Sequence, residues 1–123
     1  MAKSTAAASE MFLAKGAGDI YAALVNAARN RLGANKAVED PKQTCVHLTA
    51  GMGGTAFAGV HPRKAAVLLN IRLKKPLKSS RVRKIEQAST HRFHCEMILT
   101  SPSDVDAELL GWLDEAYQLA ADR

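Results

Sequence analysis

A chain of 123 residues, of which 47% are hydrophobic, is long enough to build one domain around a core that needs neither disulfides nor metals. It contains no apolar run of about 18 residues, so we expect no membrane-spanning helix. Its first residues lack the apolar core of a signal peptide, and its net charge of +5 is unevenly spread along the chain.

Positive charge is concentrated in residues 63–92. This segment holds ten lysines and arginines and one acid, Glu86, which is a net charge of +9 against +5 for the whole chain and leaves −4 for the rest. Such asymmetry favours an anionic partner over a neutral one. A solvated basic surface without any partner would have the same composition.

The N-terminal third predicts a tail, one clear helix and a loop. Small and polar residues at 1–9 are typical of a mobile tail, and a turn or short helix is expected at 11–13. Apolar residues spaced three and four apart predict a helix over 19–32, with Gly33 as its C-cap. The polar, proline-containing segment 34–42 is expected to be a loop.

Alternation of apolar and polar residues predicts three strands in the middle of the chain. They span residues 44–49, 55–60 and 65–74, and they are joined by a glycine-rich turn at 51–54 and a second turn at 61–64. Connections this short favour an antiparallel meander. Three polar residues share one face of the third strand: Asn70, Arg72 and Lys74.

The basic segment 78–88 predicts one or two helical turns across the sheet edge, because two apolar residues lie three positions apart. Residues 91–99 then predict a fourth strand. Its apolar side carries Phe93, Cys95, Met97 and Leu99, and its polar side carries Arg92, His94 and Glu96. Further along, Ser101 can cap a helix whose apolar stripe ends at Ala120 and packs on the sheet.

Together these elements predict an α+β domain over residues 18–123. An antiparallel sheet of about four strands would be covered by helices, and residues 1–17 would form a mobile tail or short helix. The two cysteines, Cys45 and Cys95, form no CxxC pattern, and we expect both to be reduced thiols of a cytoplasmic protein. One disulfide would form only if their strands were neighbours.

The stretch THRFHCEM, residues 90–97, concentrates metal-ligating side chains. Zinc requires ligands that converge, whereas neighbouring residues of a strand point to opposite faces. His91 and His94, three positions apart, would also diverge. We therefore expect no metal site confined to this stretch and no cofactor.

The polar face of the predicted sheet is the better candidate site. Arginine can hold a carboxylate or phosphate through two hydrogen bonds, and histidine adds a donor that responds to pH. This face could also be simply the solvent side of a two-layer fold. The candidate ligand-binding residues are Arg72, Arg92 and His94, with His47, Asn70, Lys74 and Glu96 around them.

Motifs of known enzymes are missing. The turn GMGG lacks the lysine and the serine or threonine of a P-loop, and no GxSxG or HExxH occurs. Cys45 and His47 could pair as thiol and base, but side chains two apart on a strand are about 7 Å from each other, too far for direct proton transfer. Whether the protein is an enzyme stays open, with binding favoured.

The sequence also resembles a family of small bacterial domains, domain of unknown function 5655. The resemblance rests on FAGVHPRKAAVLLNIRLKKP at 57–76 and THRFHCEMILTSPSDVDAELLGWLDEAY at 90–117, and it covers about residues 18–120. It implies a curved antiparallel sheet with helices packed on it. No activity is established for the family as a whole, so the resemblance carries over no catalytic residues. Members often follow another uncharacterised domain, which these 123 residues do not contain, and whether the domain acts alone stays open.

Three functions are compatible with these observations. The first is a non-enzymatic domain that binds an anionic small molecule or an acidic protein surface. The second is a nucleic-acid-binding accessory protein, supported by the basic segment but not by the aromatic content of 5%. The third is an enzyme centred on Cys45, His47 or His94. An exposed sheet edge would also allow a homodimer.

Overall fold

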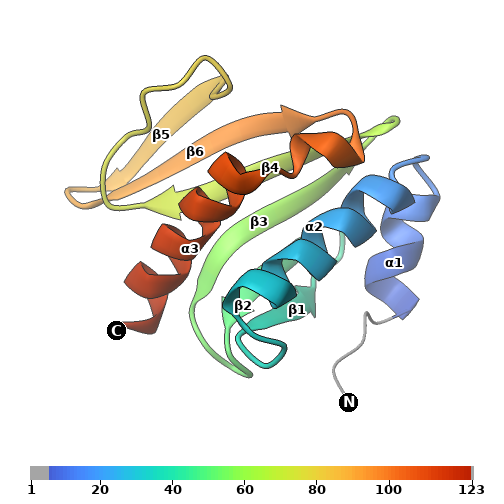
Figure 1. Ribbon diagram of the computed structural model, residues 1–123, viewed down its shortest axis with the longest axis horizontal. Helices are drawn as coiled ribbons and strands as arrows, with labels where there is room; N and C mark the ends of the chain where they lie inside the picture. The colour runs from blue at the N-terminus through green and yellow to red at the C-terminus, as the bar shows by residue number, and fades with distance from the viewer. Residues whose placement is uncertain (1–5, 123) are drawn as a thin grey trace.

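The protein folds as a six-stranded antiparallel sheet with three α-helices packed on it, in a computed structural model that describes residues 6–122. Figure 1 shows these elements. The helices are α1 (Ala6–Leu13), α2 (Gly18–Leu32) and α3 (Ala107–Ala121). The strands are β1 (Ala37–Pro41), β2 (Val46–Ala50), β3 (Ala56–Arg63), β4 (Ala66–Leu73), β5 (Lys84–Ser89) and β6 (Arg92–Leu99), arranged in the order β1-β2-β3-β4-β6-β5. The α+β class is as predicted, but the sheet has six strands instead of about four.

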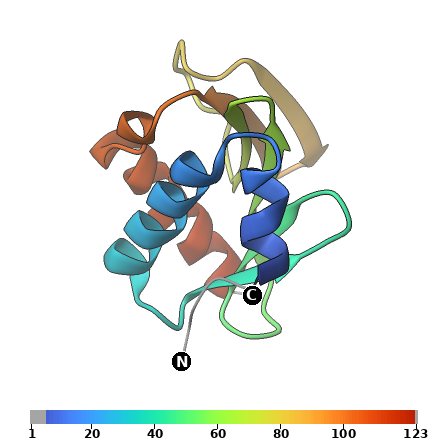
Figure 2. The ribbon, with the colours of Figure 1, turned by 90° about the vertical axis from the view of Figure 1, so that its right-hand side faces the viewer.

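α2 and α3 lie on one face of the sheet, so these elements form two layers, as Figure 2 shows from the side, and α1 packs against α2 and the strands β1 and β3. Between the layers lies the core, which the alternating apolar residues of the strands form together with α2 and α3. β4 and β6 contribute the residues assigned to their apolar sides, which confirms the predicted alternation. The buried residues of these two strands on the helix side are Val67, Leu69, Ile71, Leu73, Cys95, Met97 and Leu99.

β1 is the first element that the sequence analysis missed, because it assigned residues 34–42 to a loop. The strand pairs with β2 from Ala37↔Ala50 to Pro41↔Val46 and forms one edge of the sheet. A proline is tolerated at the end of an edge strand, since no neighbour there needs its missing N–H. Glu39 of this strand is buried, which a polar loop would not predict.

β5 corrects a second prediction, the short helix over residues 78–88. This strand pairs with β6 and forms the opposite edge of the sheet. All of its residues are exposed, so backbone hydrogen bonds to β6 hold it in place and no apolar alternation marks it in the sequence. An edge strand rich in charge is also a common protection against unwanted strand pairing.

The turn between β3 and β4 is shorter than predicted. His61, Pro62 and Arg63 belong to β3, and Ala65, expected within a strand, turns the chain with a φ of +52°. β3 extends past Val60, the last of its residues that pairs with β2. Pro62 therefore has no partner in β2 that would need a backbone N–H from it. By contrast, the glycine-rich turn at 51–54 is confirmed, with Gly51 at φ +84° and Gly53 at φ +71°.

The ends of the chain also differ in detail from expectation. Residues 6–9, predicted as part of a tail, belong to α1, while the rest of that predicted tail lies outside the described residues. α2 and its C-cap Gly33 are confirmed. Ser101 caps a short 3₁₀ helix at Pro102–Asp104, and α3 begins later, with the carboxylate of Asp106 accepting a hydrogen bond from the backbone N–H of Leu109.

No helix in the described part of the chain has the length and apolar character needed to cross a membrane.

Candidate functional site

The sheet opens where β3 begins and β4 ends. The ladder between these strands stops at Ala58↔Ile71, whereas β4 stays paired with β6 as far as Leu73↔Phe93. A β-bulge between β2 and β3, next to Thr49, bends β3 away, and its curvature is visible in Figure 1. Bulges and splayed strands leave space between elements, and here the space lies beneath the C-terminal turns of α3.

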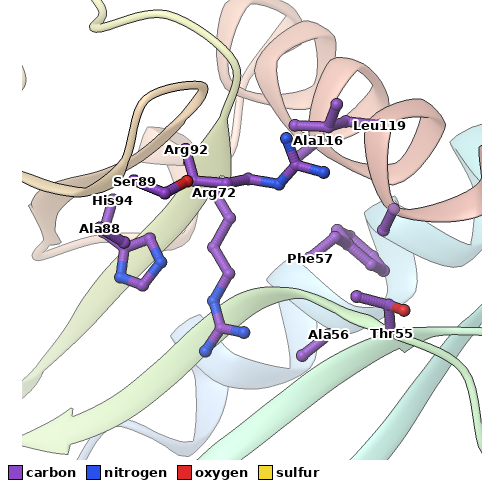
Figure 3. Close-up of a pocket in the computed structure, with 11 residues that line it drawn as sticks. Thr55, Ala56, Phe57, Arg72, Ala88, Ser89, Arg92, His94, Ala116 and Leu119 are labelled. Atoms are coloured by element: carbon purple, nitrogen blue, oxygen red, sulfur yellow. The ribbon is translucent and has the colours of Figure 1, made fainter. Parts of the chain in front are cut away.

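A pocket of about 300 Å³ occupies this opening. Its volume is at the lower end of the range for small-molecule sites. Figure 3 shows the side chains around it, with Arg72, Arg92 and His94 coming from the strands and Ala116 and Leu119 from α3. The pocket therefore brings together the three residues that the sequence analysis placed at the centre of its candidate site.

Arg72 is the unusual residue of this pocket. Its side chain is half-buried, its Nε atom is fully buried, and no described residue forms a hydrogen bond or ion pair with its guanidinium group. Burial lowers the pKa of Arg72 below its ordinary value, and the Cys45 thiol opposes this shift. A buried N–H donor without an acceptor is costly, and an anion is the kind of group that a guanidinium binds through charge-assisted hydrogen bonds.

Arg92 and His94 complete the polar side of the pocket. Arg92 donates a hydrogen bond from Nη1 to the backbone oxygen of His91 at 2.9 Å and forms no ion pair with a described residue. His94 lies directly opposite Arg72 on the neighbouring strand and opposite Glu86 on its other side. Burial, and then the charge of Arg72, lowers the pKa of His94, so its imidazole is largely neutral at pH 7.

The polar face continues beyond the pocket as a row across the sheet. His47, Gly59, Asn70 and Glu96 follow one another on four adjacent strands. The Oδ1 atom of Asn70 is buried and has no hydrogen-bond partner among the described residues, while Glu96 pairs with Arg83 at 3.7 Å. These residues lie beside the pocket and do not line it.

The remaining candidate residues are scattered. Lys74 is exposed just past the end of β4 and is not part of the pocket. Cys45 is buried before the start of β2, Cys95 is in the core, and both are free thiols. No group of three or more His, Cys, Asp or Glu side chains within the described residues is arranged to hold a metal ion.

Several residues of the site escaped the sequence analysis. His61 was assigned to a turn, yet it lies on the polar face of β3, with its Nε2 atom 3.4 Å from where a Cβ of Gly59 would be. The rest of the pocket lining, most of it apolar, was also missed: Thr55, Ala56, Phe57, Ala88, Ser89, Ala116, Leu119 and Ala120. No pattern in the sequence indicates that α3 packs over this end of the sheet, because that contact depends on the packing of elements far apart in the chain.

Three histidines of the polar face predict how stability depends on pH. Burial is the largest cause that lowers the pKa of His47, His61 and His94 below 6.5, and Arg72 lowers all three further. Near pH 6.5 and below, these histidines therefore bind more protons in the unfolded chain than in the folded protein. The free energy of unfolding is fully present above about pH 6.5, and part of it is lost as the pH falls towards the pKa values of the folded protein. Urea unfolding at about pH 7.5 and pH 5.5 is expected to give the lower free energy of unfolding at the lower pH.

The control for this prediction is a set of substitutions. Replacing the three histidines together with glutamine is expected to flatten the pH dependence, whereas His91→Gln, at an exposed position, leaves it unchanged. If the triple variant keeps the full pH dependence of the natural protein, the assignment to these imidazoles is wrong.

The basic segment does not form one surface. Arg81 donates hydrogen bonds to Asp106 and Glu108 of the α3 N-terminal region, and its guanidinium group lies 5.7 Å from the centroid of the Trp112 ring. Arg83 pairs with Glu96, and two further arginines line the pocket. The ammonium groups of five exposed lysines form no ion pair or hydrogen bond with a described residue: Lys64, Lys74, Lys75, Lys78 and Lys84.

Comparison with known proteins gives one match. The sequence model of a family described as Domain of unknown function (DUF5655) matches residues 10–120, which is most of the chain. No curated protein and no solved structure matches the chain.

Proposed function

Starting from a chain that belongs to the DUF5655 family, whose description names no activity, we propose that this protein is a binding domain for a small anion. The anion would lie in the pocket between the opening of the sheet and α3. Arg72 and Arg92 would hold it by charge-assisted hydrogen bonds, and His94 would add a donor when protonated. The observation that carries the proposal is the half-buried guanidinium of Arg72, which has no acceptor among the described residues.

Two further features support binding rather than catalysis. The thiol of Cys45 does not line the pocket, so the pocket lacks the nucleophile that the sequence offered. A catalytic pair also needs its members within hydrogen-bond reach, and no hydrogen bond links a cysteine and a histidine among the described residues. The two free thiols are in keeping with a reducing compartment, so we place the protein in the cytoplasm as part of this proposal.

The test is stabilisation by an anion. Sodium phosphate, compared with sodium chloride at the same ionic strength, is expected to raise the Tm of the natural protein, because a ligand at ten times its Kd adds about 1.4 kcal/mol to the free energy of unfolding. The double variant Arg72→Ala, Arg92→Ala is expected to unfold near the Tm of the natural protein in chloride and to lose the increase in phosphate.

The matched control removes the same charge elsewhere. Lys74→Ala with Lys75→Ala deletes two exposed cations outside the pocket, and it is expected to keep the full response to phosphate. An equal response in the arginine double variant would contradict the proposal, since the anion would then bind by general surface charge.

Nucleic-acid binding is the second candidate function. It is favoured by the exposed lysines before and within β5 whose ammonium groups have no partner among the described residues, and which could neutralise phosphates along a backbone. Against it, Phe57 is fully buried and Trp112 and Tyr117 are partly buried against the core, so none of these rings offers a fully exposed stacking platform. A gel-shift titration at low and high salt distinguishes the two, because the absence of retardation at low salt removes the nucleic-acid candidate.

A further inference from the structure

The pocket has two chemically different halves, and we infer from them that its ligand is an amphiphilic anion: an aryl or short alkyl group that carries one phosphate or carboxylate. This inference rests on the proposed function and specifies the class of ligand. It follows from the position of the pocket at the opening between β3 and β4, where its lining includes residues of the polar sheet face and of α3.

One half is cationic and belongs to the polar face of the sheet. Arg72 and His94 are cross-strand neighbours on β4 and β6. Arg92 lies two residues before His94 on β6, on the same face of the sheet. Figure 3 shows Arg72 and His94 on the strand side, while the guanidinium group of Arg92 reaches toward Ala116 and Leu119 of α3. The guanidinium group of Arg72, which forms no hydrogen bond with a described residue, offers an anionic head group charge-assisted donors.

The other half is apolar and belongs to the helix side. Phe57 is fully buried and packs edge-to-face on Tyr117 of α3, with ring centroids 5.7 Å apart. Ala116 and Ala120 lie one helical turn apart on the buried side of α3, and Leu119 is half-buried beside them. Their small side chains leave the space that larger residues at these positions would fill.

A free inorganic anion would use only one of these halves. It would be held by the arginines but would leave the apolar wall, where Ala56, Ala88 and Leu119 are at least partly exposed, in contact with water. A ligand with an apolar body would bury this wall and gain the corresponding hydrophobic stabilisation. An apolar molecule without charge would leave the guanidinium of Arg72 without an acceptor. The two halves together therefore select a ligand with both features.

The experiment compares ligands that differ in one half at a time. Binding of phenyl phosphate, inorganic phosphate, benzoate, acetate and benzyl alcohol is measured by isothermal titration calorimetry on the full chain. At least one of the two aromatic anions is expected to bind ten-fold or more tightly than its counterpart without the ring. Benzyl alcohol is expected to show no measurable binding.

Variants of α3 connect this preference to the pocket. Ala120→Leu fills the apolar half, and Leu119→Ser makes it polar; both are expected to weaken binding of the preferred aromatic anion ten-fold while leaving binding of phosphate or acetate unchanged. Ala107→Leu, at an exposed position on the same helix, is the matched control and keeps the natural affinity. The Tm of each variant shows that the fold is retained, and Leu119→Ser provides the test if Ala120→Leu does not fold.

The results separate this inference from the proposed function. Equal affinities for the aromatic and the ring-free anions, both lost in the Arg72→Ala, Arg92→Ala variant, would overturn the inference and leave the anion site intact. Binding of benzyl alcohol as tight as that of phenyl phosphate would also overturn it. If no anion binds in a way that depends on the two arginines, both the inference and the proposed function are wrong.

Discussion

Replacing Glu39 with alanine is expected to lower the free energy of unfolding by about 3–5 kcal/mol, because it breaks a buried ion pair and leaves one charge without its partner. Only 2% of the Glu39 side chain is exposed, and Arg29 of α2 donates a hydrogen bond to its carboxylate at 3.0 Å. The hydroxyl of Tyr21 donates to the other carboxylate oxygen. Burial and this hydrogen bond raise the pKa of Tyr21, so the phenol stays protonated and keeps donating.

The neighbouring residue provides the control. Asp40 forms a surface ion pair with Lys42 at 3.0 Å, and nearly half of each side chain is exposed. Surface pairs of this kind contribute less than about 1 kcal/mol, so Asp40→Ala should have a small effect on urea unfolding. Comparable losses for the two variants would show that the contact between α2 and β1 is not a buried anchor. Glu39→Gln, which keeps an acceptor for Tyr21, is expected to lie between the two.

Replacing Phe12 with alanine is expected to cost about 3–5 kcal/mol, which is typical of the loss of a large buried aromatic side chain. The Phe12 ring is fully buried and stacks on Tyr21, with ring centroids 4.1 Å apart and planes 9° apart. Tyr21 in turn contacts Glu39, so the stack links α1 to the α2–β1 contact. Removing the ring would leave a cavity beneath α1.

The adjacent Leu13 is the matched control for this second experiment, because 64% of it is exposed. Leu13→Ala should change the free energy of unfolding by about 0.5 kcal/mol or less, as surface substitutions usually do. A similarly small effect of Phe12→Ala in urea unfolding would mean that α1 contributes little to the stability of the domain. That result would favour the domain boundary at residue 18 that the sequence suggests.

Local patterns predicted most of the helices and the inner strands correctly. The spacing of apolar residues in 19–32 matches α2, and the alternation in 65–74 and 91–99 matches the buried faces of β4 and β6. Such patterns work where burial repeats with the period of the element. They failed at β1 and β5, which form the two edges of the sheet. Whether an edge strand forms depends more on its pairing with another strand than on its own side chains.

The candidate site shows the same division. Alternation alone was enough to place Arg72 and His94 on one face, and the register of β4 and β6 makes them direct neighbours. Nothing in the sequence indicates that β3 parts from β4 at Ala58, or that Ala116 and Ala120 of α3 lie over that opening. The apolar half of the pocket was therefore beyond prediction.

The sequence by itself determined the two-sided character of the inner strands and of α3, because side-chain direction follows from backbone geometry over a few residues. Only the tertiary structure decided that the polar face opens into a pocket, that Arg72 is left there without an acceptor among the described residues, and that Glu39 is buried against α2. The reason is physical: the burial of a side chain and its hydrogen-bond partners depend on segments far apart in the chain. Those contacts form only when the sheet and the helices pack together.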